Sequence, residues 1–203
     1  MSPRTRAHGT VRTGANSAYW EPLWRSGRRY RSIDVPEREA LYRQAGVGGG
    51  RPALDIGSGD GALVRALTDL GYRATGIDCA PGALSAARHE HPGLDFRHFD
   101  FGTDDPAGLP EPAFALITCR LVYPWVQDKP GFLARVRRLL APGGVFWVAT
   151  SVHRPRSGSA ARPWEVGAAE VELLAGTWSR ADVTQLDESY HCFALHPGGP
   201  PSM

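Results

Sequence analysis

The chain has 203 residues, of which 42% are hydrophobic and 22% are charged, and its formal net charge is +2. This length favours one domain with a sizeable core, and the nearly balanced charge argues against a protein that mainly coats nucleic acid. Its three scattered cysteines form neither a disulfide framework nor a zinc-type spacing, so we expect a reducing, cytoplasmic location.

The N-terminal quarter of the chain is basic and aromatic. Residues 1–51 hold ten arginines and four acidic residues, and residues 19–30 interleave arginine with tyrosine and tryptophan. The first residues lack the apolar core of a secretory signal, and no apolar run approaches membrane-spanning length. We therefore expect a flexible tail over residues 1–18, a lid or helical segment over residues 19–50, and no membrane partner.

From residue 35 onward, apolar patterns alternate between the helical and the strand type. Helices are predicted over residues 35–45, 61–70, 81–90, 129–140 and 164–176. Strands are predicted over residues 51–56, 72–78, 94–99, 113–119, 145–150, 181–186 and 190–195. This alternation predicts a three-layer α/β/α sandwich whose seven-stranded, mostly parallel sheet ends in an antiparallel hairpin. Residues 51–197 would form this domain, and residues 198–203 a disordered tail.

The first predicted strand ends in Asp55 and runs directly into a glycine-rich turn. Gly57 and Gly59 lack a Cβ, so the backbone there can approach a ligand closely and can adopt positive φ angles. Asp78 ends the second strand, at a distance from the glycines that suits a carboxylate accepting both hydroxyls of a ribose. Asp55 would repel a pyrophosphate but suits a ligand that carries an ammonium and a sulfonium. These residues predict an adenosine-containing ligand at the carboxyl end of the first strand.

The segment Asp55-Ile56-Gly57-Ser58-Gly59-Asp60-Gly61 resembles the first motif of the class I S-adenosylmethionine (SAM) dependent methyltransferases, an acidic residue followed by Gly-x-Gly-x-Gly. Asp78 adds the second acid, and residues 139–148 resemble the family's Leu-x-Pro-Gly-Gly turn into the fifth strand. The resemblance extends over residues 51–150. It implies a Rossmann-like methyltransferase fold, SAM as cofactor and S-adenosylhomocysteine (SAH) as product.

Further cofactor-binding residues follow from this resemblance. Cys79 would line the adenine pocket, Asp100 would accept the adenine amino group, and the Phe101 backbone would meet the adenine ring. Cys119 would pack beside the cofactor, and Arg120 would pair with a carboxylate of cofactor or substrate. The sequence leaves other acids open in place of Asp100, namely Asp95, Asp104 and Asp105. No metal-ligand set is expected.

Trp20, Trp24 and Gly27 weakly resemble the Trp-x3-Trp-x2-Gly stretch of thiopurine-type methyltransferases, in which an N-terminal segment closes over the cofactor. The resemblance implies that residues 19–30 form a lid in which Trp20, Trp24 and Tyr30 face the substrate. The alternative is that these aromatic residues only pack in the core.

We expect methyl transfer to a nucleophilic nitrogen, oxygen or carbon of a small-molecule acceptor, in specialised metabolism, because no separate recognition domain is evident. Tyr123 and His153 follow the fourth and fifth strands, where either could take a proton from the attacking atom. Three alternatives stay open: an RNA or ribosome methyltransferase that uses the basic N-terminal segment, an NAD(P)-dependent oxidoreductase, and a non-catalytic SAM-binding regulator. Asp55 and the Gly-x-Gly-x-Gly spacing disfavour the oxidoreductase. For the methyltransferase we expect a small-molecule partner and no nucleic-acid partner. We also expect a monomer or homodimer.

Overall fold

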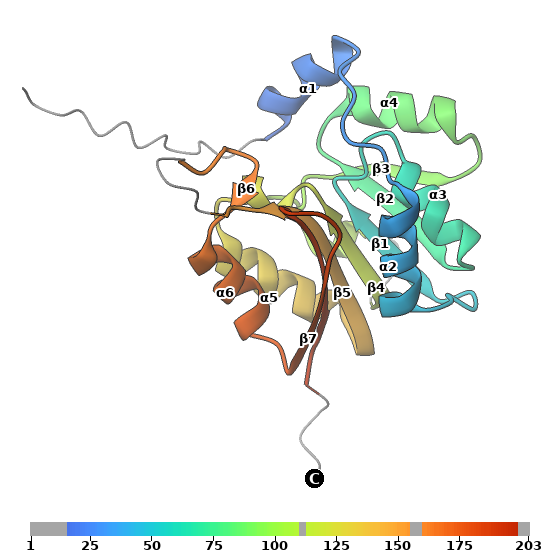
Figure 1. Cartoon of the computed structure of the whole chain (residues 1–203). Coiled ribbons are helices and arrows are strands. Elements are labelled where there is room, and N and C mark those ends of the chain that lie inside the picture. Colours follow the sequence, from blue (N-terminus) through green and yellow to red (C-terminus); the bar gives the residue numbers. More distant parts are fainter. Residues whose placement is uncertain (1–15, 110–112, 155–159, 199–203) are drawn as a thin grey trace, which may run out of the picture.

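A central sheet organises the computed structural model, which describes residues 16–109, 113–154 and 160–198 (Figure 1). Within these residues the sheet has eight strands: β1 (Pro52–Ile56), β2 (Arg73–Asp78), β3 (Asp95–His98), β4 (Phe114–Arg120), β5 (Leu140–Val152), β6 (Glu165–Val166), β7 (Arg180–Gln185) and β8 (Tyr190–His196). Their order is β3-β2-β1-β4-β5-β8-β7, and β6 pairs with β5. The predicted α/β fold with a largely parallel sheet is confirmed.

Strand β8 reverses the direction of the sheet. It runs antiparallel to both β5 and β7, whereas β1, β2, β3, β4 and β5 pair in parallel. The predicted antiparallel hairpin at the end of the chain is therefore present as β7 and β8. The strand that the sequence did not predict is β6, where Glu165 and Val166 pair with Ser151 and Val152. Because these residues join the sheet, the helix predicted from residue 164 begins only at Ala168.

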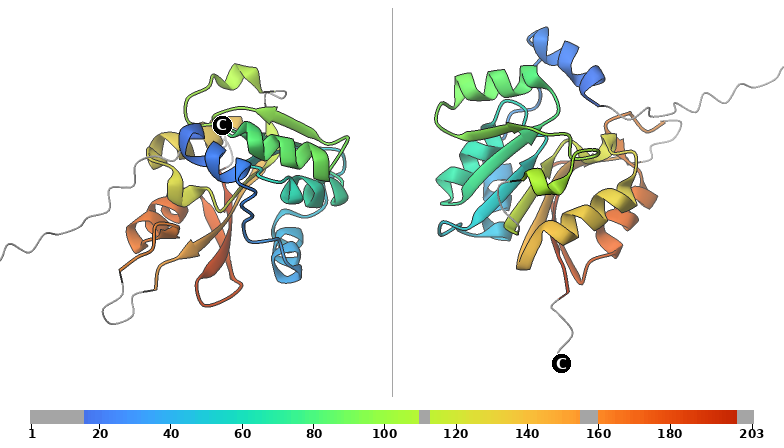
Figure 2. Two further views of the ribbon diagram at one scale, coloured as in Figure 1. Left: turned by 90° about the horizontal axis from the view of Figure 1, so that it is seen from above. Right: turned by 180° about the vertical axis from the view of Figure 1, so that it is seen from behind.

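Helices cover both faces of the sheet, which gives the predicted three layers (Figures 1 and 2). Three helices lie on one side: α2 (Val35–Ala45), α3 (Ala62–Asp69) and α4 (Pro81–Glu90). Two lie on the other: α5 (Lys129–Leu139) and α6 (Ala168–Gly176). The remaining helix, α1 (Ser17–Arg25), packs against α4. Two short 3-10 turns complete the fold, η1 (Pro106–Gly108) and η2 (Tyr123–Trp125).

The central strands are apolar on both faces, as expected for strands covered by helices on each side. Leu54 and Ile117 belong to the cluster that packs under α5 and α6. Leu116 and Trp147 face the opposite way, into the cluster that contains Leu41 of α2. Helix α2 is thus part of the main core, although the sequence grouped it with the lid segment.

Local signals explain where the N-terminal helices begin. Asn16 accepts a hydrogen bond from the backbone N–H of Ala18 and so caps α1, a helix that the sequence analysis did not predict. Asp34 caps α2 in the same way, by accepting from the N–H of Glu37. The expected tail of residues 1–18 lies almost wholly outside the described residues, as do residues 199–203 of the expected C-terminal tail. Among the described helices, none is long and apolar enough to cross a membrane.

Candidate functional site

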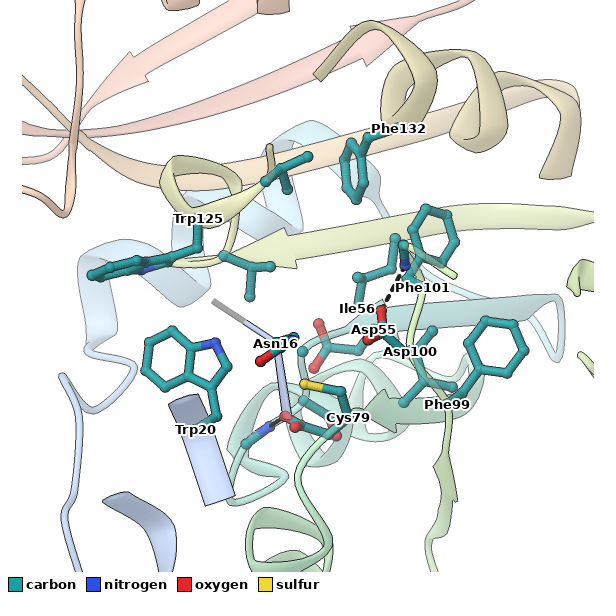
Figure 3. Close-up of a pocket in the computed structure, with 18 of the residues that line it drawn as sticks. Asn16, Trp20, Asp55, Ile56, Cys79, Phe99, Asp100, Phe101, Trp125 and Phe132 are labelled. Carbon is teal, nitrogen blue, oxygen red and sulfur yellow. Dashed lines mark hydrogen bonds between the residues drawn. The ribbon is translucent and has the colours of Figure 1, made fainter. Parts of the chain in front are cut away.

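A cavity of about 800 Å³ opens where β1, β2 and β4 end (Figure 3). The strand order changes direction between β1 and β4, because β2 lies on one side of β1 and β4 on the other. Ligands of open α/β sheets bind at such switch points, outside the carboxyl ends of the strands. The cavity volume also falls within the range of about 300–1,000 Å³ that is usual for small-molecule sites.

The glycine turn forms the floor of this cavity. Gly57, Gly59 and Gly61 all have positive φ angles, of 70°, 54° and 84°. The N–H groups of Gly57 and Ser58 donate to the carbonyl of Ile77 at 2.8 and 3.0 Å, which ties the turn to β2. A Cβ at Gly57 would lie 2.3 Å from Cγ2 of Val122. This close contact and the positive φ together restrict the position to glycine, because the Val122 side chain packs directly against it.

Asp55 lies at the end of β1 and lines the cavity, although its side chain is almost fully buried. The hydroxyl of Thr118 on β4 donates to its carboxylate at 2.7 Å. Burial raises the pKa of Asp55 to about 7. A buried carboxylate with one hydroxyl partner gains a strong second partner when a ligand brings an ammonium group to it.

Asp78 and Cys79 form the side of the cavity beside the glycine turn. The Asp78 carboxylate accepts backbone N–H groups from Gly59 at 3.0 Å and from Ala80 at 2.9 Å. Burial raises the pKa of Asp78 and raises that of the Cys79 thiol to about 12. A carboxylate has about four acceptor positions, so Asp78 can also accept from a ribose hydroxyl.

The far end of the cavity is lined by Phe99, Asp100, Phe101 and Phe132 (Figure 3). The Asp100 carboxylate accepts from the N–H of Gly102 at 2.9 Å. The Phe101 ring packs against Phe132 with centroids 5.1 Å apart. A flat heterocycle could lie among these rings, with Asp100 offering the carboxylate that an amino group would need.

Helix α1 packs along the glycine turn and the start of α4. A Cβ at Gly59 would come within 3.1 Å of the Trp24 ring, so the helix lies directly against the turn. The Glu21 carboxylate accepts the N–H of Gly82 in the first turn of α4 at 2.7 Å. Trp20 meets Trp125 of η2 at 5.2 Å between centroids. Trp20, Trp24 and Tyr30 all line the cavity, and Trp24 also packs against Ala80 and Ala83.

Arg120 also lines the cavity, but its guanidinium is already paired. It donates to both carboxylate oxygens of Glu37 on α2, at 2.7 and 3.0 Å, and Glu37 is fully buried. Tyr190 donates a third hydrogen bond to Glu37 at 2.9 Å. The sequence predicted that Arg120 would pair with a carboxylate of the cofactor or the substrate. In the structure Arg120 lines the cavity, but its guanidinium pairs with the carboxylate of Glu37 instead.

Three residues predicted at the site do not line the cavity. The Cys119 side chain points into the core below α5 and α6. Tyr123 is buried in the same cluster, with its hydroxyl 3.4 Å from the carbonyl of Glu170. His153 pairs with Glu165 of β6 at 3.2 Å. Burial raises the pKa of Cys119 and that of Tyr123. The structure thus corrects the placement of all three side chains.

The turn after β4 explains the position of Tyr123. Leu121 has a φ of 62° and is the one non-glycine residue with positive φ in the described part of the chain. This left-handed residue redirects the chain after Arg120, so that Val122 and Trp125 line the cavity and Tyr123 turns into the core. Sequence reasoning did not select Val122 or Trp125, although Trp125 shares its segment with Tyr123.

The geometry fits SAM. Gly57 and Gly59 line the cavity with backbone in the positive-φ region, and the Asp78 carboxylate keeps acceptor positions for the ribose. Ser58 also belongs to the cavity lining, although its hydroxyl is buried and has no hydrogen-bond partner. No group of His, Cys, Asp or Glu side chains in the described segments could hold a metal ion.

Comparisons with known proteins agree with this geometry. A family model described as a methyltransferase domain matches residues 54–146. Malonyl-[acyl-carrier protein] O-methyltransferase of Serratia marcescens is 31% identical over 149 residues, which are 72% of this chain and 56% of that protein. Ubiquinone biosynthesis O-methyltransferase of Paramagnetospirillum magneticum is 32% identical over 130 residues, 63% of this chain and 49% of that one. The chain therefore spans about half the length of these relatives.

Solved structures share the fold. The SAM-dependent methyltransferase of Geobacter sulfurreducens, solved in complex with SAH, superposes with a TM-score of 0.63 at 17% identity, over 87% of this chain and 96% of that one. The family match begins on β1 and ends on β5, and so includes the strand ends that build the cavity. Residues 54–146 accordingly form a methyltransferase domain, similar in sequence and fold to SAM-dependent methyltransferases.

Proposed function

We propose that the protein transfers the methyl group of SAM to a nucleophilic nitrogen, oxygen or carbon of a small-molecule acceptor. One observation carries this proposal: the same cavity joins the glycine turn of β1 to an aromatic end formed by α1 and η2. A cofactor on the turn would leave the aromatic end for a second molecule. Acceptor and cofactor would then meet within one partly enclosed volume.

Asp55, Asp78 and the glycine turn would hold the cofactor, with the Phe99–Phe101 end for its adenine. Bound SAM supplies a methyl group that its sulfonium has already activated. The chain's own residues would then align the acceptor and limit the access of water, which is enough to accelerate an activated transfer. Tyr123 and His153 are not proposed as proton acceptors, because neither side chain lines the cavity.

The acceptor has to be inferred from this chain and not from its relatives. The names of the relatives include malonyl-[acyl-carrier protein], ubiquinone-pathway and trans-aconitate methyltransferases, which act on chemically different molecules. Their shared feature is methyl transfer, and the proposal takes over that feature alone. The cytoplasmic location and the monomeric or homodimeric state remain predictions.

Two measurements test the proposal. In a thermal-shift assay, SAH should raise the melting temperature and NADH should not, because a ligand that binds the native state stabilises it. Purified protein incubated with methyl-labelled SAM and a metabolite extract of its source should then yield a labelled small molecule. SAH binding without any labelled product would favour the non-catalytic regulator. Salt-dependent RNA retention, with label in the RNA, would favour the RNA methyltransferase.

A further inference from the structure

The end of the cavity farthest from Phe99 and Phe101 is walled by aromatic rings. Trp20 and Trp125 meet edge to face, with centroids 5.2 Å apart (Figure 3). Tyr30 continues this wall, 5.8 Å from Trp20 and 5.2 Å from Trp24. Of these four residues only Trp125 lies within the segment matched by the family model, so this end is built mainly by the chain's own N-terminal segment.

The two cations at this end of the cavity are both neutralised by carboxylates. Arg120 is held by Glu37, as described above. Arg31 pairs with Asp34 at 2.9 Å and with Asp187 at 3.3 Å. Two guanidinium groups therefore face three carboxylates, and the buried Asp55 lies nearby. An anionic acceptor would therefore find neither Arg31 nor Arg120 unpaired among the residues that line this end, and Arg28, whose guanidinium lies 5.9 Å from the centre of the Tyr30 ring, does not line the cavity.

One uncharged hydrogen-bonding group remains in the aromatic wall. The hydroxyl of Tyr30 is buried and has no hydrogen-bond partner. Tyr30 lines the cavity, so a ligand in the cavity could supply the missing partner. A buried hydroxyl that stays without a partner is costly, and pairing it would contribute to ligand binding.

We propose that the acceptor is a planar, uncharged aromatic molecule that carries a hydroxyl or amino group, held against Trp20, Trp125 and Tyr30. Flat rings gain from edge-to-face and offset contacts with tryptophan and tyrosine, and the polar substituent pairs with the Tyr30 hydroxyl. The proposal deepens the proposed function and rests on it, because it presupposes a cofactor on the glycine turn.

The test measures probe binding to the SAH-saturated protein by calorimetry. The probes are 2-naphthol as the flat, uncharged molecule, tricarballylate as the anion and tetramethylammonium as the cation. We expect 2-naphthol to bind most tightly. Trp20→Ala and Trp125→Leu should each weaken its binding by about two- to tenfold, the range expected for one aromatic contact. Trp164→Ala is the matched control, since Trp164 is exposed and lies outside the cavity.

Each other outcome has a defined meaning. Tighter binding of tricarballylate or tetramethylammonium, or no binding of 2-naphthol, overturns the inference. Unchanged 2-naphthol affinity in both tryptophan variants also overturns it. The SAH dissociation constant of each variant shows whether the fold is intact, and Trp125→Phe should restore most of the affinity lost in Trp125→Leu. Failure of the wild-type protein to bind SAH would instead contradict the proposed function.

Discussion

Glu37 on α2 and Arg120 at the end of β4 form a paired salt bridge, with N–O distances of 2.7 and 3.0 Å, inside the protein. Removing one partner of a buried pair leaves the other charge without compensation and costs about 3–5 kcal/mol. We therefore expect Arg120→Leu to lower the free energy of unfolding by this amount. The double variant Glu37→Leu/Arg120→Leu should lose less, because it buries no unpaired charge. Urea denaturation measures both.

The exposed pair of Arg65 and Asp69 provides the control for this experiment. Their side chains are 56% and 47% exposed, so solvent screens the interaction. Arg65→Ala should change the free energy of unfolding by less than about 1 kcal/mol. If Arg120→Leu had an equally small effect, the buried pair would not stabilise the native state as argued.

Asp55 predicts a pH dependence of stability in the ligand-free protein. Burial raises its pKa to about 7, so the neutral carboxyl is the form that the folded state favours. The stability from this group is fully present at low pH and is lost as the pH rises through about 7. Between about pH 6 and about pH 8, the wild type should lose about 1 kcal/mol relative to Asp55→Asn, which cannot ionise. A pH-independent difference between the two proteins would contradict the assignment.

The same titration should control cofactor binding. If the ionised Asp55 carboxylate pairs with an ammonium group, SAH affinity should rise between about pH 6 and about pH 7.5 as that carboxylate forms. Asp55→Asn should bind SAH more weakly, and its affinity should vary little over this range. Calorimetry at each pH gives the comparison. An affinity of the wild type that falls over the same interval would argue against this pairing.

Gly57 predicts a steric effect on both stability and binding. Its φ of 70° disfavours any side chain, and a Cβ would lie 2.3 Å from Cγ2 of Val122. Gly57→Ala should lower the free energy of unfolding by about 2 kcal/mol or more and should weaken SAH binding by about tenfold or more. Gly93→Ala is the control, because Gly93 has a φ of 88° but open space around it. The control should lose stability without losing SAH affinity.

The sequence predicted the positions of those residues that depend on the local pattern of apolar residues, glycines and prolines. Asp55 and Asp78 end apolar strands, and a parallel sheet brings the carboxyl ends of its strands to one edge. Their common placement beside the glycine turn therefore followed from spacing alone. The helix over residues 35–45 was also predicted from its proline near the start and its glycine at the end.

The features that the sequence did not predict depend on partners far along the chain or on an unusual backbone conformation. Arg120 pairs with Glu37, 83 positions earlier in the sequence. Tyr123 turns inward because Leu121 adopts a left-handed conformation, which no glycine signals. His153 lies next to Glu165 because β5 pairs with β6. Periodicity and motif spacing carry no information on such partners, so these side chains could be placed only by the structure.

The ring of Trp24 lies against the glycine turn, where it could hold a bound ligand in place. If α1 closes over the cofactor, loss of the Trp24 ring should make it easier for the bound cofactor to leave. It should have little effect on how fast the cofactor binds. Trp24→Ala should therefore raise the SAH dissociation rate by about tenfold and leave the association rate within about twofold of the wild type. Stopped-flow tryptophan fluorescence measures both rates. Pro22→Ala, on the exposed side of the same helix, should leave both unchanged. Equal dissociation rates in Trp24→Ala and the wild type would mean that α1 only packs against the turn and does not retain the ligand.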